Sequence, residues 1–321
     1  MTPFVSILIP CFNAERWVAQ AIESALAQTW PHKEVIVVDD GSTDGSLDII
    51  KSFGDRIRWE AGPNRGGNAA RNRLLEMARG DWLQYLDADD YLMPDKVTLQ
   101  AAAVETRPDA DVLFGPLIIE WHLDGAVRTT QEPIPEPHDP WRLLALWHLP
   151  QTGAPLWKKS ALLDVGGWLD GQPCCQEHEL YLRLLMAGKR FIYHPATGAV
   201  YRRFSNGSVS TRSPALVRGE RLKIEKRIED HLTTIGGLTP ERQWAVNQAR
   251  FDMARSSWNE DRSEARAILE SIAGMASFQP NGPAAPLLYR LAYRLFGFEI
   301  AERIATMNRV LAPLIKPQAG Q

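Results

Sequence analysis

The sequence predicts an α/β fold: a mostly parallel sheet flanked by helices, with a helical extension at the C-terminus. Two observations carry this prediction. Short apolar runs alternate with segments of helical periodicity through the first 90 residues, which is the pattern of parallel strands joined by helical crossovers. After residue 213 the patterns are almost all helical, and no strand signal follows.

The N-terminal part is expected to alternate strands and helices. The runs at residues 4–10 and 34–38 are continuously apolar, as in strands that are buried on both faces. Further strands are expected at residues 56–60 and 82–86, and helices at residues 14–28, 44–53 and 66–79. No G-x-G-x-x-G follows the first strand, which argues against a dinucleotide-binding fold.

The middle of the chain follows a different pattern. Residues 112–120 and 126–130 are expected to form a hairpin around Leu123-Asp124-Gly125. A loop at residues 132–140 and a short helix at residues 140–148 come next. A strand is expected at residues 153–158, then a helix at residues 160–165 capped by Ser160. An amphipathic helix at residues 176–187 is expected to end at Gly188.

Composition excludes several classes of protein. Hydrophobic residues make up 45% and charged residues 23% of the 321 residues, which excludes a disordered chain. The net charge of −3 provides no basic field, so nucleic acid is not an expected partner. Three cysteines are too few for a disulfide framework and suit a reducing compartment, so a cytoplasmic location is predicted.

The N-terminal apolar run lacks a basic segment before it and ends at Pro10. It is therefore interpreted as a strand and not as a signal peptide. No stretch of about 20 apolar residues occurs, so no transmembrane helix is predicted.

Two acidic clusters follow expected strands. Asp39 and Asp40 end the second strand, and Asp87-Ala88-Asp89-Asp90 ends the fourth. Ligands bind beyond the carboxyl ends of parallel strands, and two carboxylates spaced two residues apart point to the same side of an extended chain. Their repulsion is relieved by a divalent cation, for which oxygen ligands favour Mg²⁺ or Mn²⁺. The plain alternative is that these residues only form turns and cap the next helix.

Together with these clusters, the segments at residues 5–13, 37–44 and 87–90 resemble the family-2 glycosyltransferases. The resemblance covers residues 4–210 and implies a GT-A fold. It also implies a metal-dependent, inverting transfer of a sugar from a nucleotide-diphosphate donor, with a UDP-sugar favoured, to a hydroxyl acceptor. The acceptor would be a glycan or a lipid-linked molecule in glycan or polysaccharide biosynthesis.

The resemblance also implies the domain organisation. Residues 1–212 are expected to form the catalytic domain, with a nucleotide-sugar half at residues 1–110 and an acceptor half at residues 111–212. Residues 213–321 would form the helical extension. From the residues alone, a nucleotidyltransferase and a non-catalytic nucleotide-sugar-binding protein remain as alternatives.

Donor-binding residues follow from the matching motifs. Asp39 would accept a hydrogen bond from the nucleotide base, and Asp89 would hold Mn²⁺ or Mg²⁺ on the diphosphate. Residues 64–72 match a third nucleotide-facing segment that includes Arg71, whose planar cation suits phosphate or base oxygens; its plain alternative is a solvated helix charge. The donor contacts implied are Pro10, Phe12, Asn13, Asp39, Asn68, Arg71, Asp87 and Ala88.

An inverting transfer needs a general base on the acceptor side. In the family an acidic pair opens the helix expected at residues 176–187, and Gln176 and Glu177 stand at that place. The resemblance therefore implies that Glu177 is the base, and the helix N-terminus would stabilise its ionised form. Glu179 faces elsewhere and is the weaker candidate, while His178 is expected to pack or to face solvent. The plain alternative for Glu177 is a charge that only complements the helix dipole.

The acceptor is expected beside the Gly-Gly-Trp turn that ends at Trp168, with Gly167 and Gln176 nearby. The Trp168 ring would either stack on a sugar or pack in the core. No histidine follows Arg202 and Arg203, so the metal would rest on Asp89, and these arginines would steady the diphosphate. The eleven Trp divide into an acceptor group (Trp121, Trp141, Trp147, Trp157, Trp168), a core group (Trp17, Trp30, Trp59, Trp82) and two unassigned residues (Trp244, Trp258).

The C-terminal part contains an apolar stripe with helical spacing. It comprises Leu287, Leu291, Leu295 and Phe298, with Arg290 and Arg294 beside it. A basic amphipathic helix of this kind lies on an anionic membrane, which would suit peripheral contact with the inner face of a membrane. Alternatively, the stripe packs on its own protein or on a second copy as a homo-oligomer.

Overall fold

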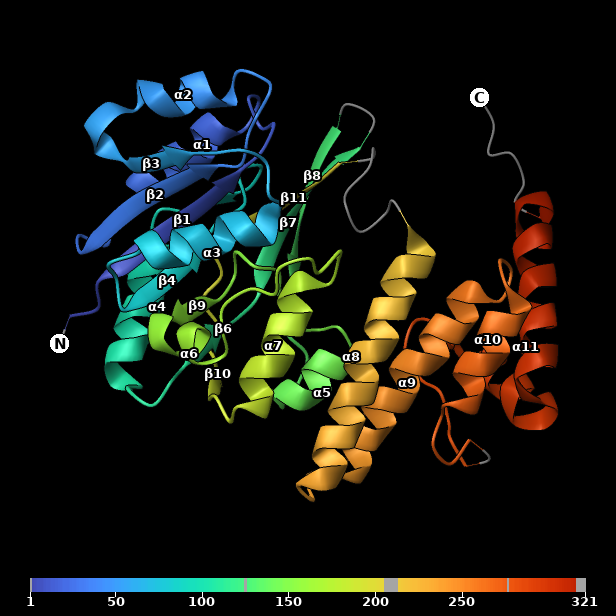
Figure 1. Cartoon of the computed structure of the whole chain (residues 1–321). Coiled ribbons are helices and arrows are strands. Elements are labelled where there is room, and N and C mark those ends of the chain that lie inside the picture. Colours follow the sequence, from blue (N-terminus) through green and yellow to red (C-terminus); the bar gives the residue numbers. More distant parts are fainter. Residues whose placement is uncertain (1, 124–125, 205–212, 276, 316–321) are drawn as a thin grey trace. The chain divides into compact units, whose positions relative to one another are not determined.

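The computed structural model describes residues 2–123, 126–204, 213–275 and 277–315, and in the last helix the side chains as far as Met307. The chain divides into two compact units, Met1–Ile224 and Glu225–Gln321 (Figure 1). The sequence predicts a division at residue 212. The functional division of the first unit into a donor half and an acceptor half stays a prediction.

The larger sheet forms the centre of the first unit. Its strands are β1 (Val5–Cys11), β2 (Lys33–Asp39), β3 (Arg58–Ala61), β4 (Trp82–Tyr85), β6 (Val112–Phe114), β9 (Leu156–Lys158) and β10 (Phe191–Tyr193). They lie in the order β10-β6-β9-β4-β1-β2-β3. The pairs β1–β2, β1–β4, β2–β3 and β6–β10 are parallel, whereas β9 runs antiparallel to both of its neighbours. The mostly parallel sheet that the sequence predicts is confirmed.

A smaller sheet lies in the same unit. It contains β5 (Tyr91–Leu92), β7 (Leu117–Leu123), β8 (Ala126–Glu132) and β11 (Ala199–Phe204), in the order β5-β11-β7-β8. The antiparallel β7–β8 pair confirms the predicted hairpin. Two residues of its predicted turn, 124 and 125, lie outside the described residues. The short strands β5, β10 and β11 were not expected from the sequence, because each is set by pairing with a strand distant in the chain.

Helices cover the larger sheet. Those of the first unit are α1 (Val18–Leu26), α2 (Ser46–Ser52), η1 (Gly54–Arg56), α3 (Gly67–Met77), α4 (Lys96–Thr106), α5 (Pro140–Ala145), α6 (Lys159–Asp164) and α7 (Gln176–Met186). In Figure 1, α3 crosses the sheet over β1 and β2, with which it is in contact. The α3 side chains that project past the strand ends therefore reach the edge where the acidic clusters lie.

Some predicted bounds are wrong for identifiable reasons. Helix α1 begins at Val18 and not at residue 14, because the Ala14 N–H donates to Ser46 Oγ in a loop contact. The strand expected at residues 112–120 is two strands in different sheets. They separate at Gly115, whose missing Cβ would lie 2.1 Å from the His194 carbonyl oxygen. Helix α6 has Lys158 as its N-cap, so the predicted Ser160 cap is wrong.

The burial of β1 explains why the strand ends come together. Val5, Ile7, Leu8 and Ile9 are fully buried, so the strand is fixed by packing on both faces. In register, Cys11 pairs with Asp39, and the Leu86 N–H donates to the Leu8 carbonyl oxygen at 2.9 Å. The segments after β1, β2 and β4 thus leave the sheet at the same edge.

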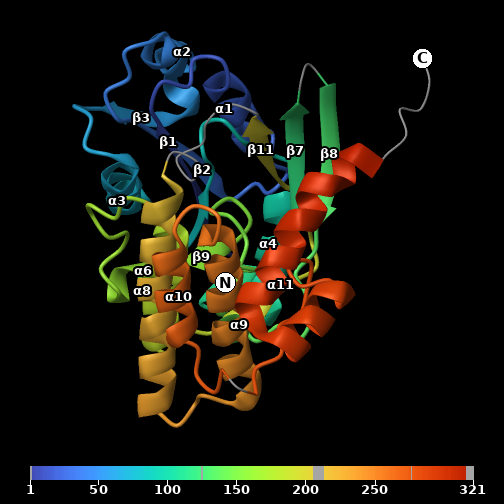
Figure 2. The same cartoon turned by 90° about the vertical axis from the view of Figure 1, so that its right-hand side faces the viewer.

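The second unit is helical, as the sequence predicts. Helix α8 (Pro214–Thr234) crosses the boundary between the units, and α9 (Pro240–Ser257), α10 (Arg262–Glu270) and α11 (Leu287–Ile315) follow. Helices α9 and α10 pack side by side (Figure 2). The rings of Tyr289, Tyr293 and Phe298 pack against Phe251, which forms the aromatic core of this unit. Helix α11 is interrupted at Gly297, whose φ of +77° is non-helical.

No helix in the described part of the chain combines the length and the apolar character needed to cross a bilayer.

Gly80 provides a test of how tightly α3 is joined to β1. A Cβ at this residue would lie 2.6 Å from the Phe4 carbonyl oxygen and 2.7 Å from the Ser6 nitrogen. Both are backbone atoms, which cannot move aside as the end of a flexible side chain can. We predict that Gly80→Ala lowers the free energy of unfolding by about 1–3 kcal/mol through overpacking. Gly62→Ala is the matched control, because nothing lies within 4 Å of its added Cβ. Urea unfolding followed by Trp fluorescence measures both, and equal effects would contradict the packing at Gly80.

Candidate functional site

A cavity of about 800 Å³ opens at the edge where β1, β2 and β4 end. Its wall is formed by the loop after β1, the loop before α3, the start of α3 and the segment after β4. The lining residues are Pro10, Cys11, Phe12, Asn13, Ala14, Trp17, Asp40, Asn64, Gly66, Gly67, Ala70, Arg71, Asp87, Ala88, Asp89 and Phe204. The two acidic clusters and the α3 segment are therefore brought together. Of the predicted residues, Pro10, Phe12, Asn13, Arg71, Asp87, Ala88 and Asp89 line this cavity.

Arg71 and Asp87 form an ion pair in the cavity wall. Arg71 Nη2 donates to Asp87 Oδ1 at 2.8 Å, and the Arg71 guanidinium lies 5.0 Å from the ring centre of Trp168. Burial lowers the pKa of Arg71, but the carboxylates of Asp87 and Glu177 raise it, and the net shift is upward. Arg71 is therefore a fixed cation that faces anionic groups from two segments, and the plain alternative of a solvated helix charge is wrong.

Asp89 lies next to this pair and has a perturbed carboxyl group. Burial, and then the neighbouring carboxylate of Asp87, raise the pKa of Asp89 to about 6. No group of three or more His, Cys, Asp or Glu side chains able to hold a metal occurs among the residues that the structure describes. A half-buried, cavity-lining carboxylate beside a second one nevertheless fits a divalent cation whose remaining ligands come from a bound phosphate and water.

Asp40 orders the loop that leads into α3. Its carboxylate accepts hydrogen bonds from the N–H groups of Arg65 and Gly66, at 2.8 and 2.9 Å. Gly41, with a φ of +76°, permits this close approach, because a Cβ there would lie 2.6 Å from the Asn64 nitrogen. Asp40 thus has a structural role that the sequence did not assign to it.

Asp39 is buried and does not belong to the residues that line the cavity. Its Oδ2 accepts a hydrogen bond from the Ser42 N–H at 3.1 Å, whereas Oδ1 is buried and has no partner in the structure. A buried acceptor without a partner is costly unless a ligand supplies a donor. The structure therefore leaves at Asp39 one acceptor of the kind that a nucleotide base would satisfy.

The loop after β1 presents Phe12 and Asn13. Asn13 adopts a φ of +48°, and its Oδ1 accepts from the Thr43 N–H at 2.8 Å, which ties this loop to the one after β2. The Phe12 side chain is 51% exposed and lines the cavity. An exposed ring on a loop that is fixed in this way is suited to stack on a flat ligand group.

Glu177 lies in the first turn of α7, outside the lining of the cavity. Thr152 Oγ1 donates to Glu177 Oε1 at 3.4 Å. Burial raises the pKa of Glu177, the Arg71 cation lowers it and Asp87 raises it, with a net upward shift. The Glu177 carboxylate thus interacts electrostatically with both members of the ion pair in the cavity wall.

The neighbours of Glu177 on α7 have structural contacts. Glu179 is buried and pairs with Arg183 at 2.7 Å, and His178 is buried and stacks on Trp147 with ring centres 3.7 Å apart. Burial lowers the pKa of His178 to about 3. The expectation that His178 packs is therefore confirmed, and Glu179 is committed to its ion pair.

The prediction that Trp168 stacks on an acceptor sugar is wrong in this structure. The residue is 1% exposed, and its ring packs edge-on against Tyr85 and Trp157. Asn72 Nδ2 donates to the Trp168 carbonyl oxygen at 2.8 Å, and the Trp168 N–H donates to Asn72 Oδ1. Gly167 also faces Asn72, since a Cβ at Gly167 would lie 2.6 Å from Asn72 Oδ1. The Gly-Gly-Trp turn therefore places the Trp168 ring against the Arg71 guanidinium.

Asn68 and Gln176 do not line the cavity either. Asn68 is buried, with Nδ2 donating to the Leu169 carbonyl oxygen at 2.7 Å, so it anchors α3 to the loop after Trp168. Gln176 is half-buried at the start of α7, beside Glu177. A role in binding for either residue stays a prediction.

Arg202 has a structural role, so the idea that it steadies a diphosphate is wrong. It is buried, and its guanidinium donates to Glu120, to Gln20 and to the carbonyl oxygen of Asp89. Its backbone N–H donates to Asp90 Oδ1 at 2.8 Å. Arg202 thus holds the Asp89 carbonyl oxygen and the Asp90 carboxylate in place and leaves Arg203 as the exposed arginine of this pair.

The sequence missed two aromatic residues of the cavity, Trp17 and Phe204. Their rings lie 5.2 Å apart, and both line the cavity. The assignment of Trp17 to the core is therefore wrong. Its place just before α1, after the loop that follows β1, is the signal that could have identified it. No local signal identifies Phe204, because β11 is placed by pairing with β7.

Comparison with known proteins agrees with this arrangement. Residues 6–162 match the family described as "Glycosyl transferase family 2". The matched segment, just under half of the chain, is therefore similar to the family-2 glycosyltransferases. This part of the chain contains β1, β2, β4 and every segment of the cavity wall except β11.

The curated relatives match only over the N-terminal part. An uncharacterised glycosyltransferase of Haemophilus influenzae is 43% identical over 102 residues, which are 30% of this chain and 41% of that protein. Chondroitin synthase of Escherichia coli is 40% identical over 30% of this chain and 15% of its own. A putative teichuronic acid biosynthesis glycosyltransferase of Bacillus subtilis, TuaG, is 39% identical over 30% and 40%. The chain thus spans less than half the length of each of these relatives.

Solved structures show the same fold over nearly the whole chain. S. aureus TarS 1-349 in complex with UDP-GlcNAc is similar with a TM-score of 0.66 at 18% identity, over 95% of this chain and 92% of that one. A second structure of the same TarS fragment gives a TM-score of 0.62 at 17% identity, over 95% and 91%. These similarities confirm the GT-A fold expected from the sequence.

The Arg71–Asp87 pair is predicted to contribute measurably to stability. Removal of one partner from a buried pair costs about 3–5 kcal/mol, and the partial exposure of this pair reduces the figure, so Arg71→Ala is expected to cost about 1–3 kcal/mol. Arg73→Ala on the same helix is the control, since Arg73 pairs with Glu60 at the surface and should cost under about 1 kcal/mol. Urea unfolding of Arg71→Ala, Asp87→Ala and the double variant gives the coupling energy. A coupling near zero would contradict the pair.

Proposed function

We propose that this protein transfers a sugar from a nucleotide-diphosphate donor to a hydroxyl group of a glycan or lipid-linked acceptor, with inversion at the sugar. The observation that carries the proposal is the meeting of Arg71, Asp87 and Asp89 in one cavity, with the Glu177 carboxylate contributing to the raised pKa of Arg71. The similarity to this family supports the reaction class, and the named relatives in chondroitin and teichuronic acid synthesis support a role in polysaccharide synthesis.

The donor would occupy the cavity of about 800 Å³. Phe12 offers a ring for the nucleotide base and Asp39 an unpartnered acceptor for a base N–H. Pro10 and Asn13 would line the base and ribose, and Asp87 would lie at the ribose and donor sugar. Arg71 would attract the anionic part of the donor. A UDP-sugar is favoured, in line with the complex of TarS with UDP-GlcNAc.

Asp89 would hold Mn²⁺ or Mg²⁺ against the diphosphate. When bound, the cation offsets the negative charge that builds up on the leaving diphosphate. Arg202 would hold this position in place, because its guanidinium donates to the Asp89 carbonyl oxygen and its backbone N–H donates to the Asp90 carboxylate. Arg71 holds the Asp87 carboxylate in one orientation through their 2.8 Å ion pair.

Glu177 would act as the general base. It would take the proton from the acceptor hydroxyl as that oxygen attacks the anomeric carbon of the sugar, on the face opposite the leaving group. Its raised pKa makes it a stronger base than an exposed carboxylate. Thr152, which donates to Oε1, would orient the carboxylate.

A panel of nucleotide sugars tested with Mn²⁺ separates this proposal from the alternatives of a nucleotidyltransferase and a non-catalytic binding protein. We expect sugar transfer, or slow donor hydrolysis without acceptor, for at least one donor. Release of pyrophosphate from a nucleoside triphosphate would favour the nucleotidyltransferase, and binding without any turnover would favour the binding protein.

Two substitutions separate the proposed roles in the active protein. We predict that Glu177→Gln lowers kcat about 10²–10⁴-fold while donor affinity is kept, because only proton transfer is lost. Asp89→Ala is predicted to abolish the Mn²⁺-dependent part of donor binding. Glu76→Gln, an exposed carboxylate on α3, is the control and should leave both unchanged. Calorimetric donor binding and initial rates measure the effects. Full turnover by Glu177→Gln would show that the base is another group.

The pH dependence of kcat provides an independent check on Glu177. A general base works only when deprotonated, and burial raises the pKa of Glu177. Activity should therefore fall as pH is lowered through a midpoint above about 4.3, the usual value for Glu. Saturating Mn²⁺ keeps Asp89 ionised during this titration. A midpoint at or below the usual value, or an unchanged acid limb in the residual activity of Glu177→Gln, would contradict the assignment.

A further inference from the structure

The first segment of α11, before Gly297, has two apolar faces. One consists of Tyr289 and Tyr293, which are buried against Phe251. The other consists of leucines that the unit leaves uncovered: Leu287, Leu288, Leu291 and Leu295 are 63%, 76%, 48% and 71% exposed. At 100° per residue these four leucines occupy one continuous arc of the helix. The expectation that this stripe packs on its own protein is therefore wrong for the leucines and correct only for Phe298.

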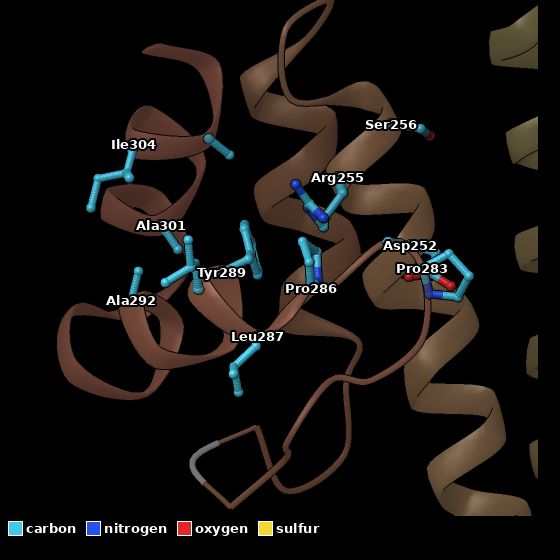
Figure 3. Close-up of a pocket in the computed structure, with 13 residues that line it drawn as sticks. Asp252, Arg255, Ser256, Pro283, Pro286, Leu287, Tyr289, Ala292, Ala301 and Ile304 are labelled. Carbon is cyan, nitrogen blue, oxygen red and sulfur yellow. The ribbon is translucent and has the colours of Figure 1, made fainter. Parts of the chain in front are cut away.

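Exposed apolar side chains also occur next to Gly297 and after it. Phe296, Ile300, Ile304 and Met307 are also exposed. A cavity of about 790 Å³ lies between α9 and the two segments of α11, and Leu287, Leu288 and Ile304 belong to its lining (Figure 3). We call the eight exposed residues of α11 the leucine face: Leu287, Leu288, Leu291, Leu295, Phe296, Ile300, Ile304 and Met307. So many large exposed apolar side chains on one element indicate an interaction site.

The charges around the leucine face have one sign. Between residues 271 and 298 the charged residues are Arg290 and Arg294 alone. In the second segment, Glu299 pairs with Arg266 at 2.8 Å, and Glu302 pairs with Arg255. The acidic groups of α11 that the structure describes are thus neutralised inside the unit, while the exposed Arg294 lies on the flank of the leucine arc.

The leucine face and the positive charges beside it together favour one kind of binding partner. If a second copy of this protein bound through the same face about a two-fold axis, the arginines of the two copies would approach one another. No acidic partner would then lie between them. An anionic bilayer instead supplies both requirements: acyl chains for the leucines and phosphate groups for the arginines. We propose that the leucine face docks the protein on the surface of an anionic lipid bilayer, with the first segment of α11 lying in the plane of the interface. The proposal does not depend on the proposed glycosyl transfer.

The test is co-sedimentation of the full chain with vesicles of phosphatidylcholine alone and of phosphatidylcholine with phosphatidylglycerol. We expect binding to the anionic vesicles, and a partition coefficient at least tenfold lower for the double variant Leu291→Ser, Leu295→Ser. Ile235→Ser is the matched control, because Ile235 is 60% exposed in the same unit but lies outside the leucine face. All three substituted residues are exposed, and an unchanged midpoint of thermal unfolding verifies that each variant is folded.

Charge is tested separately with Arg294→Gln. We expect about fivefold weaker binding to the anionic vesicles, from the loss of one cation near the surface, and no change towards phosphatidylcholine. Equal binding of the double leucine variant and the unmodified protein, or no binding to either vesicle, would overturn the proposal. So would a stable dimer in light scattering that the double leucine variant converts to a monomer, since a second copy would then cover the face. None of these readouts requires transferase activity.

Discussion

The ion pair between Arg71 and Asp87 is the contact on which the rest of the candidate site depends. It joins α3 to the segment after β4, and the buried Trp168 ring supports the guanidinium from behind. Asp89 and Glu177 both have pKa values that respond to this pair. Burial raises the pKa of both carboxyl groups, and the Arg71 cation opposes that rise in each.

The fold brings this charge cluster together through register. Buried β1 fixes where β2 and β4 end, and the loops that leave the sheet there are tied to one another by Asn13, Ser42 and Asp40. Arg202 adds a contact from the smaller sheet to the backbone of Asp89. Each of these polar groups is satisfied by a backbone partner, so the cavity is preorganised by the chain itself, as binding without large rearrangement requires.

The second unit is organised around aromatic packing. Its core is aromatic, built around Phe251, and it is complete without the leucines of α11. A helix that buries tyrosines on one side and exposes leucines on another has more apolar surface than its own unit can cover. Composition and periodicity cannot tell which of two apolar faces turns inwards, and here the larger aromatic side chains fill the interior.

The sequence by itself determined the parallel sheet, the order of its first elements and the place of Asp87 and Asp89 at a strand end, because strand periodicity is a local property. Arg71 was assigned to the same site through the resemblance to a known family. Tertiary structure decided what depends on contacts between distant segments. It placed Trp168 in the core and Trp17 at the cavity, gave Arg202 to the support of Asp89, and split the predicted strand at Gly115. Burial of a large side chain is settled by the segments that pack against it, and those lie far along the chain.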